Sequence, residues 1–389
     1  MRILIVIGHY LQISETFIYH QIKSLKADSL HIAYSKKINE ALYPINAYEF
    51  KYATKPVNFL DRILSFVFRR INKIRKYSFS YITYLRFRHY IREHNINIIY
   101  AQYGPNAIKV YPLKKYLGIP IVAIIHGYDG SALLQNSYYK KDVQVAAGFF
   151  NHVIFVSDQL LKNFKEGQIN VKKASVLPCG VDLKVFQKSG KTMENKRIII
   201  LHLGRLVSKK GVPDLLDAVI PLLAKFHQVV FRIAGSGPDA DILIKKIKKI
   251  DKIIRKRVEL VGEIDHKKAN KLFNGADIFV LNSRIAPDGD TEGIPVALLE
   301  AMAMELGIVT TNHANIPDLI QNGHNGMLIQ ERNTEELTSA IETLILDPEK
   351  RRKLGKNARQ SILRNYDINV LNKKLHSILS DEISENEIR

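Results

Sequence analysis

The decisive stretch of this 389-residue chain reads Asp288-Gly289-Asp290-Thr291-Glu292-Gly293-Ile294-Pro295-Val296-Ala297-Leu298-Leu299-Glu300-Ala301-Met302-Ala303. Gly293 lets the backbone approach a ligand closely, and Pro295 suits the first turn of the apolar helix that follows. The free N–H groups at the start of that helix form an anion site suited to phosphate. Because Glu292 and Glu300 add carboxylates that accept hydrogen bonds from sugar hydroxyls, the stretch indicates binding of a nucleotide sugar.

Length and composition indicate a globular protein with more than one domain. The chain is too long for one compact core, and its apolar share of 46% and charged share of 25% are ordinary for a soluble protein. The single cysteine, Cys179, excludes an internal disulfide and a cysteine-based zinc site, and it suits a reducing cytoplasm. Residues 1–8 are apolar but too short to span a membrane, and they lack the layout of a signal peptide.

The net charge of +20 is concentrated in the first half of the chain. Residues 1–185 hold 26 Lys or Arg against 11 Asp or Glu, whereas residues 186–389 hold 32 against 27. The densest segment is 51–92, where eleven basic residues accompany a single acid, Asp61. Such an excess favours an anionic partner, and because no nucleic-acid-binding motif accompanies it, we expect no nucleic-acid partner.

Within this basic region, residues 57–92 alternate aromatic and aliphatic residues with arginines and lysines at roughly helical spacing. One interpretation is a surface helix pair whose long basic stems cover apolar neighbours. The other is a pair of helices that lie in an anionic membrane surface, where each basic residue contributes about 1 kcal/mol. The density of aromatic and arginine residues favours the membrane.

Short β-branched runs alternate with longer amphipathic stretches along the chain, which is the pattern of parallel α/β sheets. We predict strands in the first half at 2–7, 30–34, 97–101, 121–125, 152–156 and 174–177. Those in the second half are predicted at 197–204, 229–234, 258–261, 277–281, 307–311 and 327–329. A polar linker is predicted at 182–196. The sequence therefore predicts two doubly wound, Rossmann-like domains, 1–185 and 186–370, that face a central cleft, followed by a helix and tail at 371–389.

A glycine-bounded loop, Gly204-Arg205-Leu206-Val207-Ser208-Lys209-Lys210-Gly211, follows the first strand of the second domain. Arg205 offers a planar fork and Lys210 a mobile point charge, and both can reach a diphosphate. Basic residues are also common in solvated loops, but a position directly after a strand favours a ligand site.

Several of these segments together resemble family 4 of the retaining glycosyltransferases, which have the two-domain GT-B architecture. The resemblance rests on Gly204-Arg205 with Lys210-Gly211, Gly235-Ser236-Gly237-Pro238, Asp277 to Ser283, Glu292 to Glu300, and Val176 to Asp182. Within the family, the bacterial exopolysaccharide branch, typified by colanic acid enzymes, is most similar in Ser14-Glu15-Thr16-Phe17-Ile18, His126-Gly127-Tyr128-Asp129 and Gly289 to Pro295. The similarity runs from residue 1 to about 370, and it implies a C-terminal helix that returns to the N-terminal domain.

The resemblance also implies roles for the matching residues. Arg205 and Lys210 would neutralise the donor diphosphate in place of a metal, Glu292 would contact the donor sugar, and His126 would face the reacting sugar. Glu300 would hold the ribose hydroxyls. The rest of the implied donor site is Gly235, Gly262, Glu263, Ile264, Leu281, Gly293, Ile294, Pro295 and Val296. The implied acceptor site is Ser14, Glu15, Thr16, Tyr103, Gly104 and Asp129.

The implied activity is retaining transfer of a hexosyl group from a UDP- or GDP-sugar to a lipid-linked or oligosaccharide acceptor. It would serve bacterial surface polysaccharide biosynthesis in the cytoplasm, at the inner face of the cell membrane, without a cofactor or metal. One departure concerns the first domain, where the branch usually carries His-Ala-His-Phe-Gly and this chain has Tyr100-Ala101-Gln102-Tyr103-Gly104. Gln102 does not titrate as a histidine does.

Two other classes of function fit parts of the sequence. Tandem Rossmann signals permit an NAD-type oxidoreductase, but no Gly-x-Gly-x-x-Gly follows either first strand, where Gly8-His9-Tyr10 and Gly204-Arg205-Leu206 stand instead. A non-catalytic polysaccharide- or membrane-binding protein is the other alternative, and the presence of Arg205, Lys210, Glu292 and Glu300 argues against it.

Overall fold

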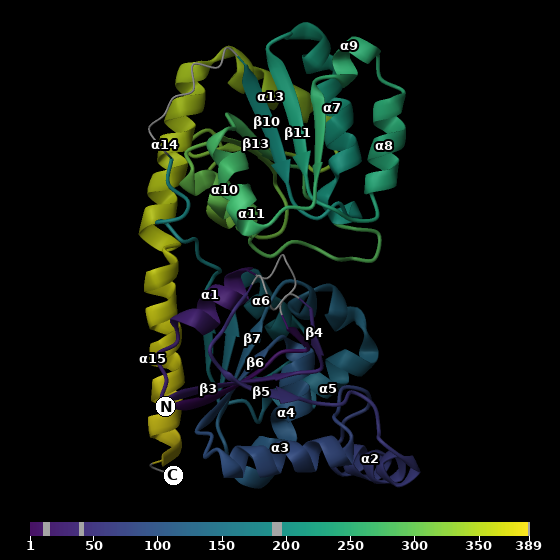
Figure 1. Ribbon diagram of the computed structural model, residues 1–389, viewed down its shortest axis with the longest axis vertical. Coiled ribbons are helices and arrows are strands. Elements are labelled where there is room, and N and C mark those ends of the chain that lie inside the picture. Colours follow the sequence, from purple (N-terminus) through teal and green to yellow (C-terminus); the bar gives the residue numbers. More distant parts are fainter. Residues whose placement is uncertain (11–15, 39–42, 189–196, 388–389) are drawn as a thin grey trace. The chain divides into compact units, whose positions relative to one another are not determined.

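The computed structural model describes residues 1–10, 16–38, 43–188 and 197–387. It divides into two compact units, Met1–Pro178 with Asn369–Arg389 (unit 1) and Cys179–Ile368 (unit 2). Each unit is built on its own parallel sheet with helices around it, as Figure 1 shows. The predicted α/β fold with two Rossmann-like domains is therefore confirmed.

The sheet of unit 1 has the strand order β5-β3-β1-β6-β7-β8-β9. Its strands are β1 (Arg2–Val6), β3 (Ser29–Tyr34), β5 (Tyr48–Lys51), β6 (Ile98–Gln102), β7 (Ile121–Ile125), β8 (His152–Phe155) and β9 (Ala174–Val176). Ile5 of β1 pairs with Ile32 of β3 on one side and with Tyr100 of β6 on the other, in parallel register. Both faces of such a sheet are covered, which explains why these strands read as continuous apolar runs.

The helices of unit 1 are α1 (Thr16–Ser24), α2 (Phe59–Ile71), α3 (Tyr81–Glu93), α4 (Gly104–Leu117), α5 (Ser137–Ala147), α6 (Asp158–Glu166) and α15 (Ile368–Glu387). Short 3-10 turns lie at η1 (Tyr128–Gly130) and η2 (Ala132–Gln135). The sequence did not predict β5 or the short parallel pair β2 (His9–Tyr10) and β4 (Lys36–Lys37). Such short strands hold too few residues for a periodicity to be seen.

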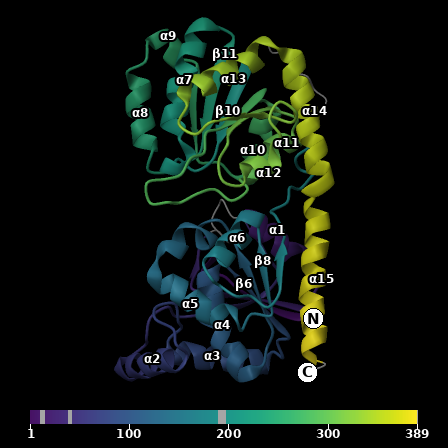
Figure 2. The same ribbon diagram turned by 180° about the vertical axis from the view of Figure 1, so that it is seen from behind.

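From Asn369 onward α15 belongs to unit 1, as the resemblance implied for the C-terminal helix, and Figure 2 shows it running along that unit. Glu382 is its main polar anchor: this carboxylate is 3% exposed, 3.2 Å from His152 Nδ1 and 3.1 Å from Lys173 Nζ. Nearer the start of the helix, His376 Nε2 lies 3.0 Å from the carbonyl oxygen of Lys26. The helix is thus held to unit 1 at both its middle and its end.

The sheet of unit 2 has the order β12-β11-β10-β13-β14-β15. Its strands are β10 (Ile198–Leu203), β11 (Val229–Ala234), β12 (Val258–Gly262), β13 (Ile278–Leu281), β14 (Gly307–Thr311) and β15 (Met327–Ile329). The helices are α7 (Val212–Lys225), α8 (Ala240–Lys248), α9 (Lys252–Arg255), α10 (His266–Asn274), α11 (Val296–Ala303), α12 (Ile316–Leu319), α13 (Thr334–Leu346) and α14 (Pro348–Asn365), with a 3-10 turn η3 (Ser208–Lys210).

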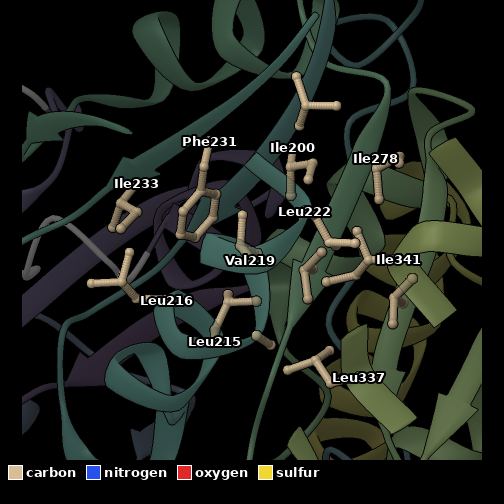
Figure 3. Packing of buried hydrophobic residues seen from close by; sticks show 14 of the residues in the cluster. Ile200, Leu215, Leu216, Val219, Leu222, Phe231, Ile233, Ile278, Leu337 and Ile341 are labelled. Atoms are coloured by element: carbon tan, nitrogen blue, oxygen red, sulfur yellow. The ribbon is translucent and has the colours of Figure 1, made fainter. Parts of the chain in front are cut away.

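One buried cluster joins α7 and α13 to the sheet of unit 2 (Figure 3). Leu215 and Val219 of α7 pack with Phe231 of β11, and Ile341 of α13 belongs to the same cluster. These side chains are fully buried. The cluster fixes the strand that supplies the basic loop, because Ile200 of β10 is part of it.

The boundary between the units lies at 178/179, earlier than the predicted 185/186. The first part of the predicted linker is packed into unit 2. Phe186 is 1% exposed and meets Phe273 edge to face at 5.9 Å, and the carbonyl oxygen of Asp182 accepts hydrogen bonds from the amides of Val185 and Phe186. The polar composition of the segment led to a linker prediction that includes this anchoring phenylalanine. Residues 189–196 of the predicted linker lie outside the described residues.

We expect Glu382→Ala to lower the free energy of unfolding of unit 1 by about 1–3 kcal/mol, because His152 and Lys173 lose a buried partner. Melting followed by circular dichroism would measure it. Glu385→Ala is the matched control, since Glu385 is half exposed and pairs with the same lysine at the surface; its effect should stay within about 0.5 kcal/mol. Equal effects of the two substitutions would show that Glu382 does not anchor α15.

Candidate active site

The candidate site in unit 2 lies where the strand order reverses, between β10 and β13. β10 pairs with β11 on one side and with β13 on the other, so the chain leaves these two neighbouring strands toward opposite sides of the sheet. Ligands of open parallel sheets bind at this point, beside the carboxyl ends of the strands. The loop 204–211 follows β10, and the segment 282–295 follows β13.

The basic loop after β10 is held tightly against the end of β13. Gly211 has φ +55, and a Cβ atom at this position would lie 2.5 Å from the carbonyl oxygen of Asn282, so only glycine fits. Asn282 Nδ2 donates to the carbonyl oxygen of Gly211 at 2.9 Å. This contact fixes the end of the loop, in which Lys210 is 8% exposed whereas Arg205 is exposed.

The structure brings Lys210 and Glu292 together in a buried ion pair. Lys210 Nζ lies 3.0 Å from Glu292 Oε1. Burial raises the pKa of the Glu292 carboxyl, but the charges of Lys210 and Lys209 outweigh it and hold that pKa below its ordinary value. Burial lowers the pKa of Lys210, helped by Lys209 and Arg205 and opposed by Glu292. At neutral pH the site therefore holds an ionised carboxylate beside a compact cluster of basic groups.

Two residues in this cluster were not predicted. Lys209 Nζ lies 2.9 Å from Asp290 Oδ2 and donates to the carbonyl oxygen of Thr291 at 3.1 Å, so it holds the segment that carries Glu292. His202, fully buried in β10, donates from Nδ1 to the carbonyl oxygen of Val280 at 3.1 Å, and burial lowers its pKa to about 4. The sequence signal for His202 was its polar side chain inside an apolar strand.

The apolar helix that carries Glu300 begins one residue later than predicted. α11 starts at Val296, so Pro295 is the N-cap, with φ −69 and ψ 120, and does not belong to the first turn. Its carbonyl oxygen accepts a hydrogen bond from the amide of Leu298 at 3.0 Å. Gly293, Ile294 and Val296 are half-buried at this end, and Glu300, 5% exposed, lies inside the helix among Leu298, Leu299 and Met302.

The glycine-rich turn after β11 packs backbone to backbone against the basic loop. Gly235 has φ +141, and a Cβ atom there would lie 1.8 Å from the carbonyl oxygen of Gly204. The amide of Leu206 donates to the carbonyl oxygen of Ser236 at 2.8 Å. Gly235 therefore allows the backbones of these two loops to come into contact.

The other predicted donor residues flank this turn or end a strand. Gly262 ends β12 and accepts a hydrogen bond from the amide of Gly235 at 2.8 Å. Glu263 is exposed and Ile264 half-buried just beyond it. Leu281 is buried at the end of β13, with its carbonyl oxygen bound by Thr310 Oγ1 at 2.9 Å, so its side chain belongs to the core.

In unit 1, His126 lies at the end of β7 between two aromatic rings. Its ring centre is 4.5 Å from that of Tyr103 and 5.1 Å from that of Phe17. His126 Nε2 is 3.0 Å from Gln102 Oε1, and burial lowers the pKa of His126 to about 3, so the ring is neutral at pH 7. Tyr103 has φ +69, a left-handed conformation that is strained for a tyrosine.

Asp129 is buried and binds two backbone amides of unit 1. It is 2% exposed, Oδ2 accepts from the amide of Gly104 at 2.7 Å, and Oδ1 accepts from the amide of His126 at 2.9 Å. Burial raises the pKa of Asp129 to about 6. Its oxygens thus hold the turns that carry Tyr103 and His126, and the acceptor contact of Asp129 stays a prediction. Of the other predicted acceptor residues, Thr16 begins α1, and Ser14 and Glu15 lie outside the described residues.

The basic aromatic segment 57–92 divides into two different helices. The aromatic residues of α3 are largely core: Phe87 stacks on Phe79 at 4.5 Å, and Tyr84 meets Phe68 of α2 at 4.7 Å. The apolar residues of α2 other than Phe68 instead point outward and are 37–76% exposed; they are Phe59, Leu60, Ile63, Leu64, Phe66, Val67 and Ile71. Periodicity alone could not separate them, because both helices carry aromatic residues at similar spacing.

Two kinds of feature are not found in the described part of the chain. Across the described ranges, no group of three or more His, Cys, Asp or Glu side chains is placed to hold a metal ion. Of the helices that the structure describes, none combines the length and apolar character needed to cross a membrane.

Two family models cover most of the chain. The model for group 1 glycosyl transferases matches residues 184–361, and the model for glycosyltransferase family 4 matches residues 43–185. A Salmonella typhimurium protein named for colanic acid biosynthesis, the glycosyltransferase WcaL, is 28% identical over 287 residues, which cover 73% of this chain and 70% of WcaL. The amylovoran biosynthesis glycosyltransferase AmsK of Erwinia amylovora is 32% identical over 170 residues, 44% of this chain and 41% of AmsK.

Solved structures share the fold at low sequence identity. The structure of HepE from Anabaena in complex with UDP-glucose superposes with a TM-score of 0.78 at 18% identity, over 98% of this chain and 100% of HepE. Sucrose-phosphate synthase from Thermosynechococcus elongatus superposes with a TM-score of 0.75 at 16% identity, over 99% and 100% of the two chains.

We expect Lys210→Met to lower the free energy of unfolding of unit 2 by about 3 kcal/mol, because it leaves the Glu292 carboxylate buried without its main partner. Adding Glu292→Gln should restore much of this loss, since the uncompensated charge is then removed. Thermal melting of the two variants measures both effects, with Lys245→Met on the exposed face of α8 as control. A double variant no more stable than Lys210→Met would show that the pair is not coupled.

Proposed function

The chain belongs to the family 4 glycosyltransferases with the GT-B fold, of the exopolysaccharide type, and from this premise we propose its donor, acceptor and mechanism. The proposed reaction transfers a hexosyl group from a UDP- or GDP-sugar to a lipid-linked or oligosaccharide acceptor in bacterial surface polysaccharide biosynthesis. The anomeric configuration is retained.

The observation that carries this proposal is the buried pair of Lys210 and Glu292 at the switch point of the unit 2 sheet. An ammonium group and a carboxylate 3.0 Å apart are arranged for a ligand with both anionic oxygens and hydroxyls. A nucleoside diphosphate sugar has both, joined by the bond that breaks. When it binds, the diphosphate contacts Lys210 and the sugar hydroxyls donate hydrogen bonds to Glu292. Lys210 and Glu292 each exchange one charge-assisted contact for another.

The proposed chemistry depends on stabilising the leaving group. Negative charge develops on the diphosphate as the glycosidic bond breaks, and Arg205 and Lys210 supply two positive charges there. With these charges no metal is needed for the diphosphate. The leaving phosphate accepts the proton of the acceptor hydroxyl on the same face of the sugar, so the configuration is kept. A double displacement through a protein nucleophile would need paired carboxyl groups, whereas the ion-pair partner of Glu292 is a lysine, Lys210.

The donor class and the pathway are supported by the relatives. HepE, whose fold this chain shares, was solved with UDP-glucose, and WcaL and AmsK are named for colanic acid and amylovoran biosynthesis. In this proposal Glu300 holds the ribose, the N-terminus of α11 holds the phosphate, and Gly262, Glu263 and Ile264 lie near the base. His126 remains the proposed unit 1 residue for the reacting sugar.

We also propose that α2 is the part of unit 1 that binds an anionic membrane surface. Its outward face is apolar, with Phe59 76% and Phe66 54% exposed, while Arg62, Arg70 and the following Lys73 are exposed beside it. Arg70 lies over the ring of Phe66 at 5.4 Å. An apolar face flanked by basic residues matches a helix lying in the headgroup region of a membrane. The proposed membrane contact is therefore narrower than the predicted segment 57–92 and consists of α2 and the basic turn after it. It supports a location at the inner face of the cell membrane.

The α2 surface is held rigidly by two buried carboxylates. Asp61 accepts from the amides of Val57 and Ile82 at 2.9 and 3.0 Å, which ties the start of α2 to the start of α3. Asp142 of α5 accepts from the amides of Arg75 and Lys76 at 2.6 and 2.8 Å. A preorganised surface loses little conformational freedom on docking.

We expect UDP or GDP, at a hundred times its dissociation constant, to stabilise the protein by about 2.7 kcal/mol in a thermal-shift assay. Arg205→Ala should remove most of this shift, and Glu300→Gln should weaken nucleotide affinity by about tenfold or more, because a charged acceptor for the ribose is lost. Arg255→Ala, a charge change on exposed α9, should leave the shift unchanged.

Other outcomes of the same assay would change the conclusion. Stabilisation by NAD(H) without any response to UDP or GDP would support the oxidoreductase. No response to any of these ligands or their sugar conjugates would favour the non-catalytic binding protein.

We expect the charge reversals Arg69→Glu, Arg70→Glu and Arg75→Glu, made together, to weaken binding to vesicles containing about one-third phosphatidylglycerol by about 100-fold or more. Co-sedimentation measures this. The matched control reverses Lys245, Lys248 and Lys249, which are exposed on or next to α8 of unit 2 and change the net charge equally. Equal losses in the two triple variants would mean that net charge, and not the α2 surface, drives vesicle binding.

A further inference from the structure

The backbone of Glu292 is held by residues that the sequence did not single out. The amide of Glu292 donates to His313 Nε2 at 3.2 Å, and its carbonyl oxygen accepts from Asn315 Nδ2 at 3.4 Å. Both residues lie between β14 and α12, and both are 1% exposed. The peptide on each side of Glu292 is thus bound by one neighbouring loop.

The hydrogen bonds of His313 require one form of its ring. Nδ1 is 2.5 Å from Glu331 Oε1, and Glu331 Oε2 accepts from the amide of Ile285 at 3.1 Å. A carboxylate accepts hydrogen bonds, so the ring proton is on Nδ1 and the lone pair of Nε2 faces the Glu292 amide. Because the His313 side chain is fully buried, no water competes for that lone pair.

The segment that carries Glu292 is irregular and is held at several points by side chains of neighbouring segments. It leaves β13 at Leu281 and enters α11 at Val296, without regular structure between them. Lys209 holds Asp290 and the carbonyl oxygen of Thr291, and Glu331 also holds Ile285 near the start of the segment. His313 binds the amide of Glu292 itself, while Lys209 binds the carbonyl oxygen of the same peptide. The contact of His313 therefore helps to set the direction in which the Glu292 carboxylate reaches Lys210.

We propose that His313 and Glu331 are positioning residues for Glu292: Glu331 fixes the ring of His313, and His313 fixes the peptide that aims the Glu292 carboxylate into the donor site. This inference rests on the proposed function for its catalytic consequence. The chain of contacts from Glu331 through His313 to the amide of Glu292, called the relay below, is purely structural. It can be tested without measuring turnover.

The first test is hydrogen–deuterium exchange of the Glu292 amide, resolved to the single residue by fragmentation. His313→Leu fills similar space without an acceptor, so exchange at Glu292 should become about tenfold faster or more. His313→Gln places an amide oxygen near the position of Nε2 and should keep the rate within about threefold of the unsubstituted protein. His324→Leu, an exposed histidine of the same unit, is the control and should change nothing.

The exchange data alone decide the relay. Unchanged exchange in His313→Leu overturns it, and so does a Gln variant that exchanges as fast as the Leu variant, because His313 would then only fill space. Should His313→Leu not fold, Glu331→Ala tests the same relay from its partly exposed end. Faster exchange at Glu292 in that variant is expected, and an unchanged rate overturns the role of Glu331.

The second test is steady-state transfer from the nucleotide sugar that binds. His313→Leu should lower kcat by about tenfold or more. The dissociation constant of this variant for the free nucleoside diphosphate should stay within about threefold of that of the unsubstituted protein, because the nucleotide is held by other groups. His313→Gln should recover most of kcat. Equal losses of kcat and nucleotide affinity in the Leu variant would indicate general damage to unit 2 and overturn the positioning role. If the unsubstituted protein transfers no sugar, the proposed function is wrong, and the exchange result still stands by itself.

Discussion

The buried ion pair between Lys210 and Glu292 is the constraint on which the rest of unit 2 depends. Two charged groups taken out of water are tolerated only when each compensates the other, and here they lie 3.0 Å apart. The pair joins the segments that follow β10 and β13, the strands between which the sheet order reverses. The same desolvation that makes the pair costly makes its charges effective toward a ligand, because they are only weakly screened by water. In our proposal the anionic oxygens of a donor replace Glu292 as the partner of Lys210, and its hydroxyls replace Lys210 as the partner of Glu292.

The close approach of backbone segments makes that pair possible. Gly211 lies against Asn282, and Gly235 lies against Gly204, each at a distance that a side chain would prevent. Lys209, His313 and Asn315 then hold the irregular segment before α11 by its peptide groups. In unit 1 the same device recurs, because Asp129 holds the turns of Tyr103 and His126 through their backbones. Many of the buried polar side chains near the candidate sites thus act on the main chain of other residues.

The α2 surface follows a different logic. Buried Asp61 and Asp142 satisfy backbone amides at the two ends of the segment, so the helix is fixed while its apolar face is left in solvent. In our proposal this outward apolar face binds a membrane surface, and its basic neighbours favour an anionic one. The aromatic residues of α3, which have the same sequence character, complete the core beneath it.

The sequence by itself determined the α/β class, the parallel strands and the two domains, because continuous apolar runs and their spacing depend only on local geometry. It also determined which residues carry charge near strand ends, Arg205, Lys210, Glu292 and Glu300 among them. Only the tertiary structure decided that Lys210 pairs with Glu292, that Asp129 holds the amides of Gly104 and His126, and that Phe186 belongs to unit 2. It alone showed that His313 binds the amide of Glu292 and that Glu331 binds the ring of His313. These contacts join residues far apart in the chain, and a side chain's burial and partner are set by what the fold places beside it, which no local pattern contains.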